Sequence, residues 1–337
     1  MSLRCRILFL FAVFVFALCA TRMVLQIARR VELIDFPSGR SSHSKPTPRG
    51  GGMAIVLGFF LALIVVSVRE QLATPFVVAI GLGGGAIAII GFVDDLRSLP
   101  AKFRIVVHIG AAIVAVWCIG TPGVRVADSE LRVWALRFLG VMSIVWATNL
   151  FNFMDGIDGI AAAETVFFAG SIGGINLYLE GNSGTSMVVW ALASAGLGFL
   201  IWNWPPAKIF MGDVGSGFVG FVLAVVVLYL GSENSMYFNL AIILAGVFIV
   251  DATITLIRRI VRGDRWFEAH RVHAYQHLSR RWKSHRAVTL LAVAVNLMWL
   301  LPWACVAVAF PDYANLVTVA AIVPLVALVV RIGAGVS

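Results

Sequence analysis

The chain has 337 residues, a formal net charge of +9, and a composition that is 60% hydrophobic and 13% charged. Soluble globular domains are usually about 45–50% apolar and about 25% charged, so these figures exclude a soluble fold, a disordered chain and a disulfide-rich scaffold. A water-soluble protein of this size cannot bury so much apolar surface. The composition therefore predicts a polytopic membrane protein, and we expect residues 1–337 to form a single transmembrane domain.

The amino-terminal apolar run is predicted to be a retained transmembrane helix. Arg4 and Arg6 ahead of this run resemble the start of a secretory signal, and the stretch ending in Cys19 resembles a lipoprotein cleavage site. Leu18, however, is too large for the position before that cysteine, and further runs of similar strength follow. Residues 7–27 are therefore interpreted as the first span.

Ten further apolar runs follow, and each is near the length of about 20 residues that crosses about 30 Å of hydrocarbon as a helix. The runs are continuous rather than alternating, so helices are predicted and a β-barrel is not. The expected fold class is all-α, an integral membrane bundle of about 11 transmembrane helices. The later spans are predicted at residues 50–68, 75–93, 104–120, 134–151, 159–179, 186–202, 214–231, 238–257, 287–310 and 314–332.

The distribution of Lys and Arg predicts how this bundle is oriented. Nineteen of the 26 lie in or beside one set of alternate loops and six in the other, with Arg22 inside the first span. The positive-inside rule assigns the richer set to the cytoplasm, with the amino terminus outside and the carboxyl terminus inside. Because the positive charge follows the loops in this way, a lipid bilayer is the expected partner and no nucleic acid is expected.

Carboxylates and amides collect on the predicted cytoplasmic side, where they indicate an enzyme site. Asp94 and Asp95 end the third predicted span, and Asp213 follows the seventh. A stripe of Asn and Asp residues recurs every third position in the sequence TNLFNFMDGIDG. One such Asp alone is as readily a helix cap, but so many like charges on one face imply a bound cation. Hard oxygen ligands favour Mg²⁺, for which Mn²⁺ can substitute, and Mg²⁺ typically accompanies phosphate substrates.

Two basic loops on the same side supply the opposite charge. Residues 40–52 combine Lys45, Arg49 and His43 with three glycines ahead of the second span, where free backbone N–H groups could hold a phosphate. The last and longest of these loops, residues 258–286, contains four of the six histidines. Ordinary positive-inside loops and an amphipathic helix on anionic lipid are the alternative interpretations.

Four motifs, in this order and on one membrane face, resemble those of the polyprenyl-phosphate N-acetylhexosamine-1-phosphate transferase family. The motifs are GFVDDL, NLFNFMDGIDG, NWPPAKIFMGDVGSG and the basic histidine loop. The similarity spans roughly residues 35–285 and is strongest to the bacterial branch that initiates O-antigen synthesis. It implies a bacterial inner membrane, in which the amino terminus is expected to be periplasmic and the carboxyl terminus cytoplasmic. It implies an EC 2.7.8-type enzyme that transfers an N-acetylaminosugar-1-phosphate from a UDP-sugar to undecaprenyl phosphate, with Mg²⁺ as cofactor and UMP as product.

The resemblance and the charge of the basic loops together imply roles for particular residues. The expected metal ligands are Asp213 and Asn152. The expected catalytic residues are Asp94, Asp95, Asp155, Asp158, His270 and His273. The expected substrate-binding residues are Lys45, Arg49, Asn149, Asn203 and Arg271. The last loop departs from the compact run of histidines found in many relatives, since it contains the sequence HRVHAYQ.

The chemistry expected of such a site is phosphoryl transfer between two anions. A phosphate has its second pKa near about 6, so the acceptor is largely dianionic at neutral pH and needs no strong base. Direct attack is therefore favoured, with an aspartyl-phosphate route as the alternative. The sequence leaves open whether the sugar is GlcNAc, FucNAc or QuiNAc, and whether the protein is a homodimer. A cation-coupled transporter with a cytoplasmic carboxylate gate and a non-catalytic scaffold are the competing classes.

Overall fold

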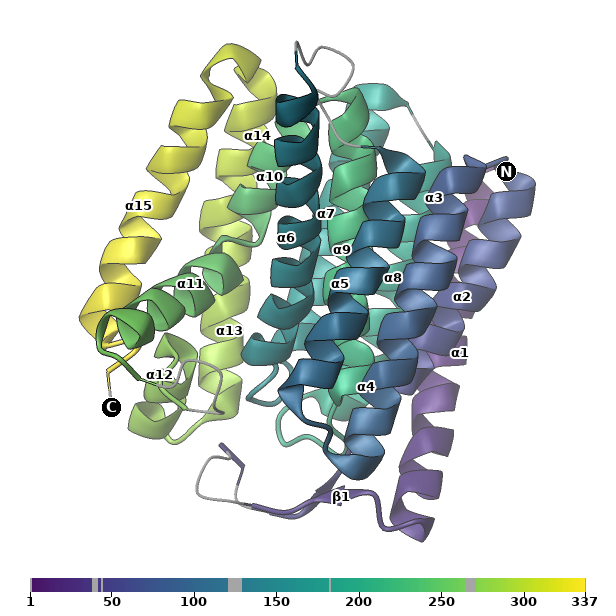
Figure 1. Cartoon of the computed structure of the whole chain (residues 1–337). Helices are drawn as coiled ribbons and strands as arrows, with labels where there is room; N and C mark the ends of the chain where they lie inside the picture. The colour runs from purple at the N-terminus through teal and green to yellow at the C-terminus, as the bar shows by residue number, and fades with distance from the viewer. Residues whose placement is uncertain are drawn as a thin grey trace.

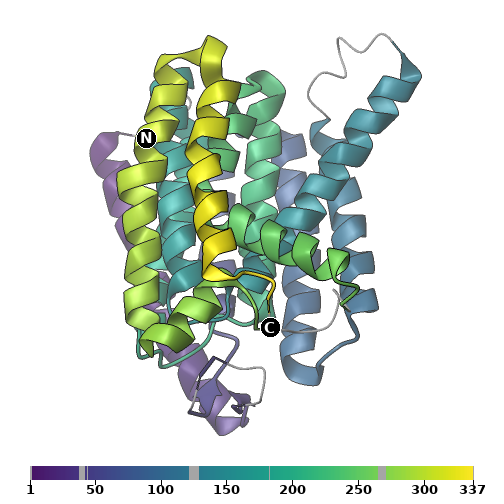
Figure 2. The ribbon, with the colours of Figure 1, turned by 90° about the vertical axis from the view of Figure 1, so that its left-hand side faces the viewer.

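The computed structural model describes residues 2–37, 42–43, 45–120, 129–181, 183–264 and 271–336. The chain forms a bundle of long helices that run side by side, with short connections at both ends (Figures 1 and 2). The first elements are α1 (Leu3–Arg30), β1 (Ile34–Asp35), β2 (Thr47–Pro48), α2 (Gly52–Arg69), α3 (Thr74–Val78), η1 (Ala79–Gly84), α4 (Gly85–Arg97), α5 (Ala101–Ile119), α6 (Glu130–Met154), α7 (Ile160–Glu180) and α8 (Ser183–Asn203). The others are α9 (Asp213–Glu233), α10 (Met236–Leu244), α11 (Gly246–Val261), α12 (Ala274–Trp282), α13 (His285–Val295), η3 (Asn296–Leu300), α14 (Leu301–Ala309), η4 (Pro311–Tyr313) and α15 (Ala314–Ile332).

The helical membrane fold predicted from the sequence is confirmed. Ten helices in the described part of the chain are long and apolar enough to cross a membrane, and the number is eleven when the bent pair α10 and α11 counts as one span. The sequence did not predict the small ribbon of β1 and β2, in which Ile34 pairs with Pro48 and Asp35 with Thr47 in antiparallel register. This ribbon lies beneath the bundle in Figure 1.

The span predicted over residues 238–257 consists of two helices rather than one continuous helix. α10 and α11 meet at Ala245 with an angle of 77° between them. Gly246 follows the break, and a Cβ added there would lie 3.0 Å from Ile322 and 3.1 Å from Leu300. The glycine therefore allows the bend to pack closely on α15 and η3. A continuous apolar run does not indicate where a helix changes direction, so hydropathy did not predict the bend. α11, the green helix in Figure 2, is strongly inclined to the long helices of the bundle.

α9 is the most enclosed of the candidate spans. In its most apolar stretch 83% of the residues are buried, against 17% for α1. It packs on α2, α4, α5, α6 and α10, and small residues allow several of these approaches. The first residue of this central helix is Asp213. The most enclosed of the candidate spans therefore begins at one of the predicted site residues.

The loops that carry the predicted site lie together at one end of the bundle. β1, α12 and the carboxyl terminus are at this end, and the amino terminus is near the other end (Figure 1). The clustering expected from the charge pattern is therefore present in the fold. The assignment of this end to the cytoplasm stays a prediction of the positive-inside rule.

Cysteine labelling tests that orientation. In a background without the four native cysteines, Arg281→Cys on α12 should resist a membrane-impermeant maleimide in intact cells. Ser235→Cys, between α9 and α10, should react, because both side chains are exposed and they lie at opposite ends of the bundle. Permeabilised cells provide the control, in which both variants should be labelled. The reverse pattern in intact cells would place the site outside the cytoplasm.

Candidate active site

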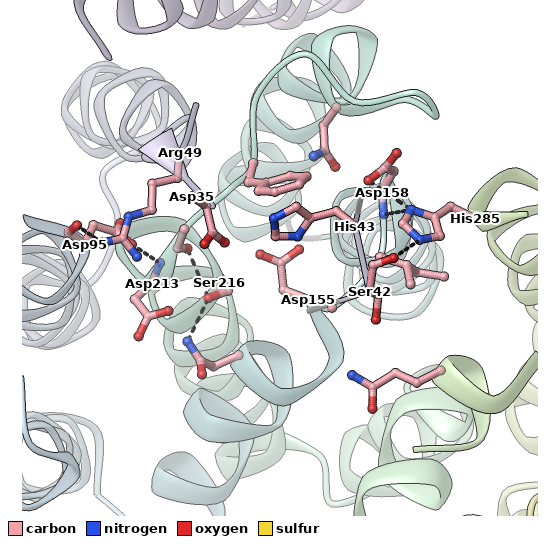
Figure 3. A pocket seen from close by; sticks show the side chains of 17 residues that line it. Asp35, Ser42, His43, Arg49, Asp95, Asp155, Asp158, Asp213, Ser216 and His285 are labelled. Carbon is pink, nitrogen blue, oxygen red and sulfur yellow. Dashed lines mark hydrogen bonds and ion pairs between the residues drawn. The ribbon is translucent and has the colours of Figure 1, made fainter. Parts of the chain in front are cut away.

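A polar pocket of about 260 Å³ opens among the loops at this end of the bundle (Figure 3). It contains side chains from β1, the segment before α2, α4, the α6–α7 turn, the α8–α9 loop, α9, α12 and α13. Seven predicted site residues line it: Arg49, Asp95, Asn152, Asp155, Asp158, Asn203 and Asp213. The structure thus brings together residues that are up to 164 positions apart in the sequence.

Asp95 fixes the start of α9. Its side chain is 2% exposed, and its Oδ1 and Oδ2 accept hydrogen bonds from the backbone N–H groups of Asp213 at 3.0 Å and Val214 at 3.2 Å. A carboxylate in this position satisfies free N–H groups at a helix start and interacts favourably with the positive end of the helix dipole. The Arg49 guanidinium donates to the backbone carbonyl of Asp95. Asp95 therefore determines where the next residue of the site, Asp213, is placed.

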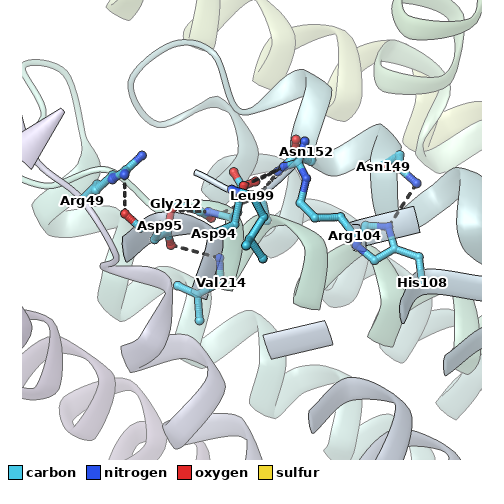
Figure 4. A network of polar contacts seen from close by, with 12 residues as sticks. Arg49, Asp94, Asp95, Leu99, Arg104, His108, Asn149, Asn152, Gly212 and Val214 are labelled. Carbon is cyan, nitrogen blue, oxygen red and sulfur yellow. Dashed lines mark hydrogen bonds and ion pairs between the residues drawn. The ribbon is translucent and has the colours of Figure 1, made fainter. Parts of the chain in front are cut away.

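Asp94 points to a different partner from its neighbour (Figure 4). Its Oδ2 pairs with the Arg104 guanidinium at 2.9 Å, and its Oδ1 accepts from the backbone N–H of Leu99. The same Arg104 nitrogen also pairs with Asp213. Arg104, at the start of α5, thereby connects α4 to α9. Asp94 does not line the pocket, and it acts on the pocket through this arginine.

The turn between α6 and α7 brings two more carboxylates into the pocket. Asp158 accepts a hydrogen bond from the backbone N–H of Ala207 at 3.0 Å, and its Oδ1 lies 3.1 Å from Nδ1 of His285. The other ring nitrogen of His285 lies 3.2 Å from the backbone carbonyl of Ser42. Asn203 accepts from the Gly159 N–H at 2.9 Å and donates to the α8–α9 loop. These contacts tie four loops around one edge of the pocket.

Asp155, like Asp35, is a carboxylate of the pocket that has no hydrogen bond or ion pair from its side chain to any described residue. Burial raises its pKa well above the usual range for an aspartate, and the negative charges of Asp213, Asp95 and Asp158 add to this effect. Its side chain is partly open to the pocket. Like charges around a carboxylate without a partner are the electrostatic setting that a bound cation relieves.

The donor set fits a magnesium ion that also binds substrate phosphates. Asp213 and Asn152 both line the pocket, and the Asn152 amide nitrogen donates to Ser216 at 3.2 Å, which leaves its oxygen available. Among the described residues, no group of three or more His, Cys, Asp or Glu side chains is arranged to hold a metal. Mg²⁺ does not require one, because it is commonly bound by one or two carboxylates together with substrate phosphates and water.

Several predicted residues lie outside the pocket. Lys45 and Arg271 are exposed and do not line it. Asn149 donates to the backbone carbonyl of Val145 and contacts His108 instead. His273 is 3% exposed, and its Nδ1 lies 3.3 Å from Oδ1 of Asp251. His270 lies outside the described residues.

The structure also adds residues that sequence reasoning did not select. His285, His43, Asp35, Ser216 and Gln276 line the pocket, and Arg104 pairs with two of its aspartates. His43 was noted only as part of a basic loop. For His285, the sequence does contain a signal, because a histidine at the start of a transmembrane helix is a candidate site residue. The contact of His285 with the Asp158 carboxylate, 127 residues earlier, is visible only in the fold.

Comparison with known proteins identifies the class of this enzyme. Residues 76–231 match the model for glycosyl transferase family 4. A probable undecaprenyl-phosphate N-acetylglucosaminyl 1-phosphate transferase of Bacillus subtilis is 30% identical over 296 residues, which cover 84% of this chain and 79% of that protein. A decaprenyl-phosphate N-acetylglucosaminephosphotransferase of Mycobacterium leprae is 32% identical, with 81% and 76% covered. The corresponding Mycobacterium tuberculosis enzyme is 31% identical over 307 residues.

The chain belongs to glycosyl transferase family 4 and, within it, to the polyprenyl-phosphate N-acetylhexosamine-1-phosphate transferases. It is a multi-pass membrane phosphotransferase of the EC 2.7.8 type. The family resemblance inferred from the four sequence motifs is thus confirmed. The membership favours a transferase over the transporter and scaffold interpretations.

Proposed function

We propose that the protein transfers N-acetylglucosamine-1-phosphate from UDP-N-acetylglucosamine to undecaprenyl phosphate at the cytoplasmic face, and releases UMP. The observation that carries the proposal is that aspartates, two asparagines and Arg49 from separate loops converge in one pocket. The names of the relatives support the choice of sugar and lipid. The product would be the first lipid intermediate of a cell-surface polysaccharide such as an O-antigen. FucNAc and QuiNAc are the alternative sugars, and an assay with a panel of UDP-sugars distinguishes them from GlcNAc.

In the proposed reaction, an oxygen of the lipid phosphate forms a bond to the β-phosphorus of the donor, and the bond between that phosphorus and the bridging oxygen of UMP breaks. Arg49 binds phosphate oxygens and reduces repulsion between the two anions. Asp95 and Asp94 hold α9 and Arg104 in position. Asp155 accepts the remaining proton of the acceptor when that phosphate is monoanionic, because its side chain lines the pocket and is partly open to it.

Asp213 and Asn152 would hold Mg²⁺ in this proposal. When bound, the ion supplies charge neutralisation for the diphosphate and makes UMP a better leaving group. The chain's own contribution is to place these two ligands. Asp213 is placed by the Asp95 contact at the start of α9, and Asn152 by its hydrogen bond to Ser216, whose hydroxyl donates to the backbone carbonyl of Gly212.

An apolar groove beside the pocket suits the polyprenyl chain. The groove has a volume of about 560 Å³ and lies between α6, α9, α10 and the start of α11. Along α6 it extends from Leu136 to Phe151, and the next residue, Asn152, lines the polar pocket. A lipid whose tail occupies the groove would therefore present its phosphate at the site. Burial of the tail stabilises binding in proportion to the apolar area covered.

Filling this groove should weaken lipid binding selectively. Ala224→Trp on α9 is expected to raise the KM for undecaprenyl phosphate by roughly tenfold, because several CH₂ groups lose their contact at about 0.8 kcal/mol each. The KM for UDP-N-acetylglucosamine should change little. Val166→Trp, in a second apolar groove between α7 and α13, is the matched control. Equal KM values for the lipid in all three proteins would exclude the α6–α9 groove as its binding site.

The function itself is tested with purified protein in detergent. UDP-[¹⁴C]N-acetylglucosamine and undecaprenyl phosphate should yield one organic-extractable labelled lipid and one UMP per turnover. A panel of UDP-sugars then ranks the donors by kcat/KM. Formation of neither labelled lipid nor UMP with any donor, in protein shown to be folded, would refute the proposal.

A further inference from the structure

Gln276, in the first turn of α12, has one end of its side-chain amide fixed by the fold. Its Oε1 accepts a hydrogen bond of 3.2 Å from the backbone N–H of His273, and this contact is one half of a capping box at the start of the helix. A backbone N–H can only donate, so the oxygen end of the amide is committed to the helix start. The Nε2 end must therefore point away from it.

Nε2 of Gln276 faces the active-site pocket. Gln276 lines the pocket, and its Nε2 would lie 3.1 Å from a Cβ added at Gly156, the residue that follows Asp155. Within the described part of the chain, this nitrogen donates to no acceptor. The side chain is nonetheless 6% exposed. A buried amide that presents two unused donors to a pocket indicates a ligand that accepts a hydrogen bond.

The helix that carries Gln276 is held firmly. Both oxygens of the buried Asp251 carboxylate accept backbone N–H groups of α12, from Ala274 at 2.8 Å and Tyr275 at 2.9 Å. The Tyr275 hydroxyl donates to the backbone carbonyl of Phe153 at 3.0 Å, at the end of α6. These contacts fix α12 against both the bent helix α11 and the α6–α7 turn. The amide is thus positioned before any ligand arrives, as a specificity determinant requires.

The chemistry of the UDP-sugar indicates which of its groups the Gln276 amide contacts. The diphosphate is anionic and is matched by Arg49 and the metal ligands, whereas Gln276 is neutral. The sugar is neutral, and its strongest hydrogen-bond acceptor is the carbonyl oxygen of the acetamido group. We infer that Nε2 of Gln276 donates to this carbonyl and so selects an N-acetylated sugar over one that has a hydroxyl group there. The inference rests on the proposed function and extends it to a specificity-determining residue.

Gln276→Glu tests the assignment without removing the helix cap. A glutamate retains an oxygen for the His273 N–H, since Glu and Gln serve equally at this position of a capping box, but it replaces the two pocket-facing donors with an acceptor. kcat/KM is measured for UDP-N-acetylglucosamine and for UDP-glucose, which has a hydroxyl in place of the acetamido group. The ratio of the two values should fall about tenfold or more, the effect of one lost hydrogen bond. When UDP-glucose turns over too slowly, its inhibition constant against UDP-N-acetylglucosamine gives the ratio.

Two control variants accompany this test. Gln276→Met has similar length and no donor, and its ratio should fall like that of Gln276→Glu. Gln26→Glu, the same chemical change at an exposed position of α1, should leave the ratio unchanged. A wild-type enzyme that discriminates between the sugars, together with Gln276 variants that lose activity equally on both, would overturn the assignment alone. Wild-type protein that is inactive on every UDP-sugar would instead contradict the proposed function.

Discussion

Asp213→Asn should reduce turnover about a thousandfold while the protein still folds and inserts into the membrane. The aspartate is the first residue of α9 and lines the pocket, and it is the one charged ligand of the proposed metal pair. Metal ions supply several kcal/mol of charge stabilisation in phosphoryl transfer, and about 4 kcal/mol corresponds to a factor of about a thousand in rate. The substitution preserves the shape of the side chain, so the bundle should tolerate it.

Two measurements check this result. Turnover of wild-type enzyme should stop in excess EDTA and return with Mg²⁺ or Mn²⁺, and Asp213→Asn should bind Mn²⁺ more weakly in a direct binding assay. Asp312→Asn, an exposed aspartate at the opposite end of the bundle, is the matched control and should behave as wild type. Full activity in EDTA would contradict the metal proposal. An Asp213→Asn enzyme of normal activity would contradict the role given to this residue.

The membrane spans were predictable because the physics that determines them is local. Continuous apolar runs of the required length are visible in the sequence, and the helices extend a few residues beyond most of them. At α6, for example, the predicted span 134–151 is observed as Glu130–Met154. The bend between α10 and α11 was not predictable from hydropathy, since both halves are apolar. It depends on how Gly246 packs against η3 and α15, which are far away in the sequence.

The site was predicted as a set of residues on one face, but their contacts were not. From the sequence, Asp94 and Asp95 are interchangeable neighbours. In the fold, Asp95 holds the start of α9 and Asp94 pairs with Arg104. The residues of the last loop illustrate the same limit. At the start of α12, the predicted residue His273 contacts Asp251, whereas Gln276 lines the pocket. Such choices depend on helix rotation and long-range packing, which single residue types do not reveal.

Gly91→Ala is the second substitution from which we expect a large effect. Gly91 lies on α4, one helical turn before Asp95, where α4 crosses the start of α9. A Cβ added there would lie 2.5 Å from the carbonyl oxygen of Asp213 and 2.7 Å from the backbone nitrogen of Val214. Neither atom belongs to a flexible side chain, so the two helices must separate. We expect a loss of about 1–3 kcal/mol in stability, as found when a packed core is overfilled.

The separation should affect activity more than stability. Asp95 follows Gly91 on the same face of α4, and its two hydrogen bonds reach the backbone nitrogens of Asp213 and Val214. Moving α4 outward lengthens both bonds, and Asp213 then moves relative to Asn152. A misplacement of about 1 Å at a reacting centre can cost about a hundredfold in rate. We therefore expect the kcat of Gly91→Ala to fall about a hundredfold and its thermal unfolding midpoint to be lower than that of the wild type.

Gly85→Ala provides the matched comparison on the same helix. Apart from the neighbouring backbone of its own helix, no heavy atom of the described residues lies within 4 Å of a Cβ added at Gly85. Alanine is preferred over glycine in a helix by about 1 kcal/mol. This variant should keep wild-type turnover and unfold at the same or a slightly higher temperature. Turnover by the lipid-labelling assay and thermal unfolding in detergent measure both effects. If Gly91→Ala and Gly85→Ala were equally active, the contact of α4 with the start of α9 would not be what positions Asp213.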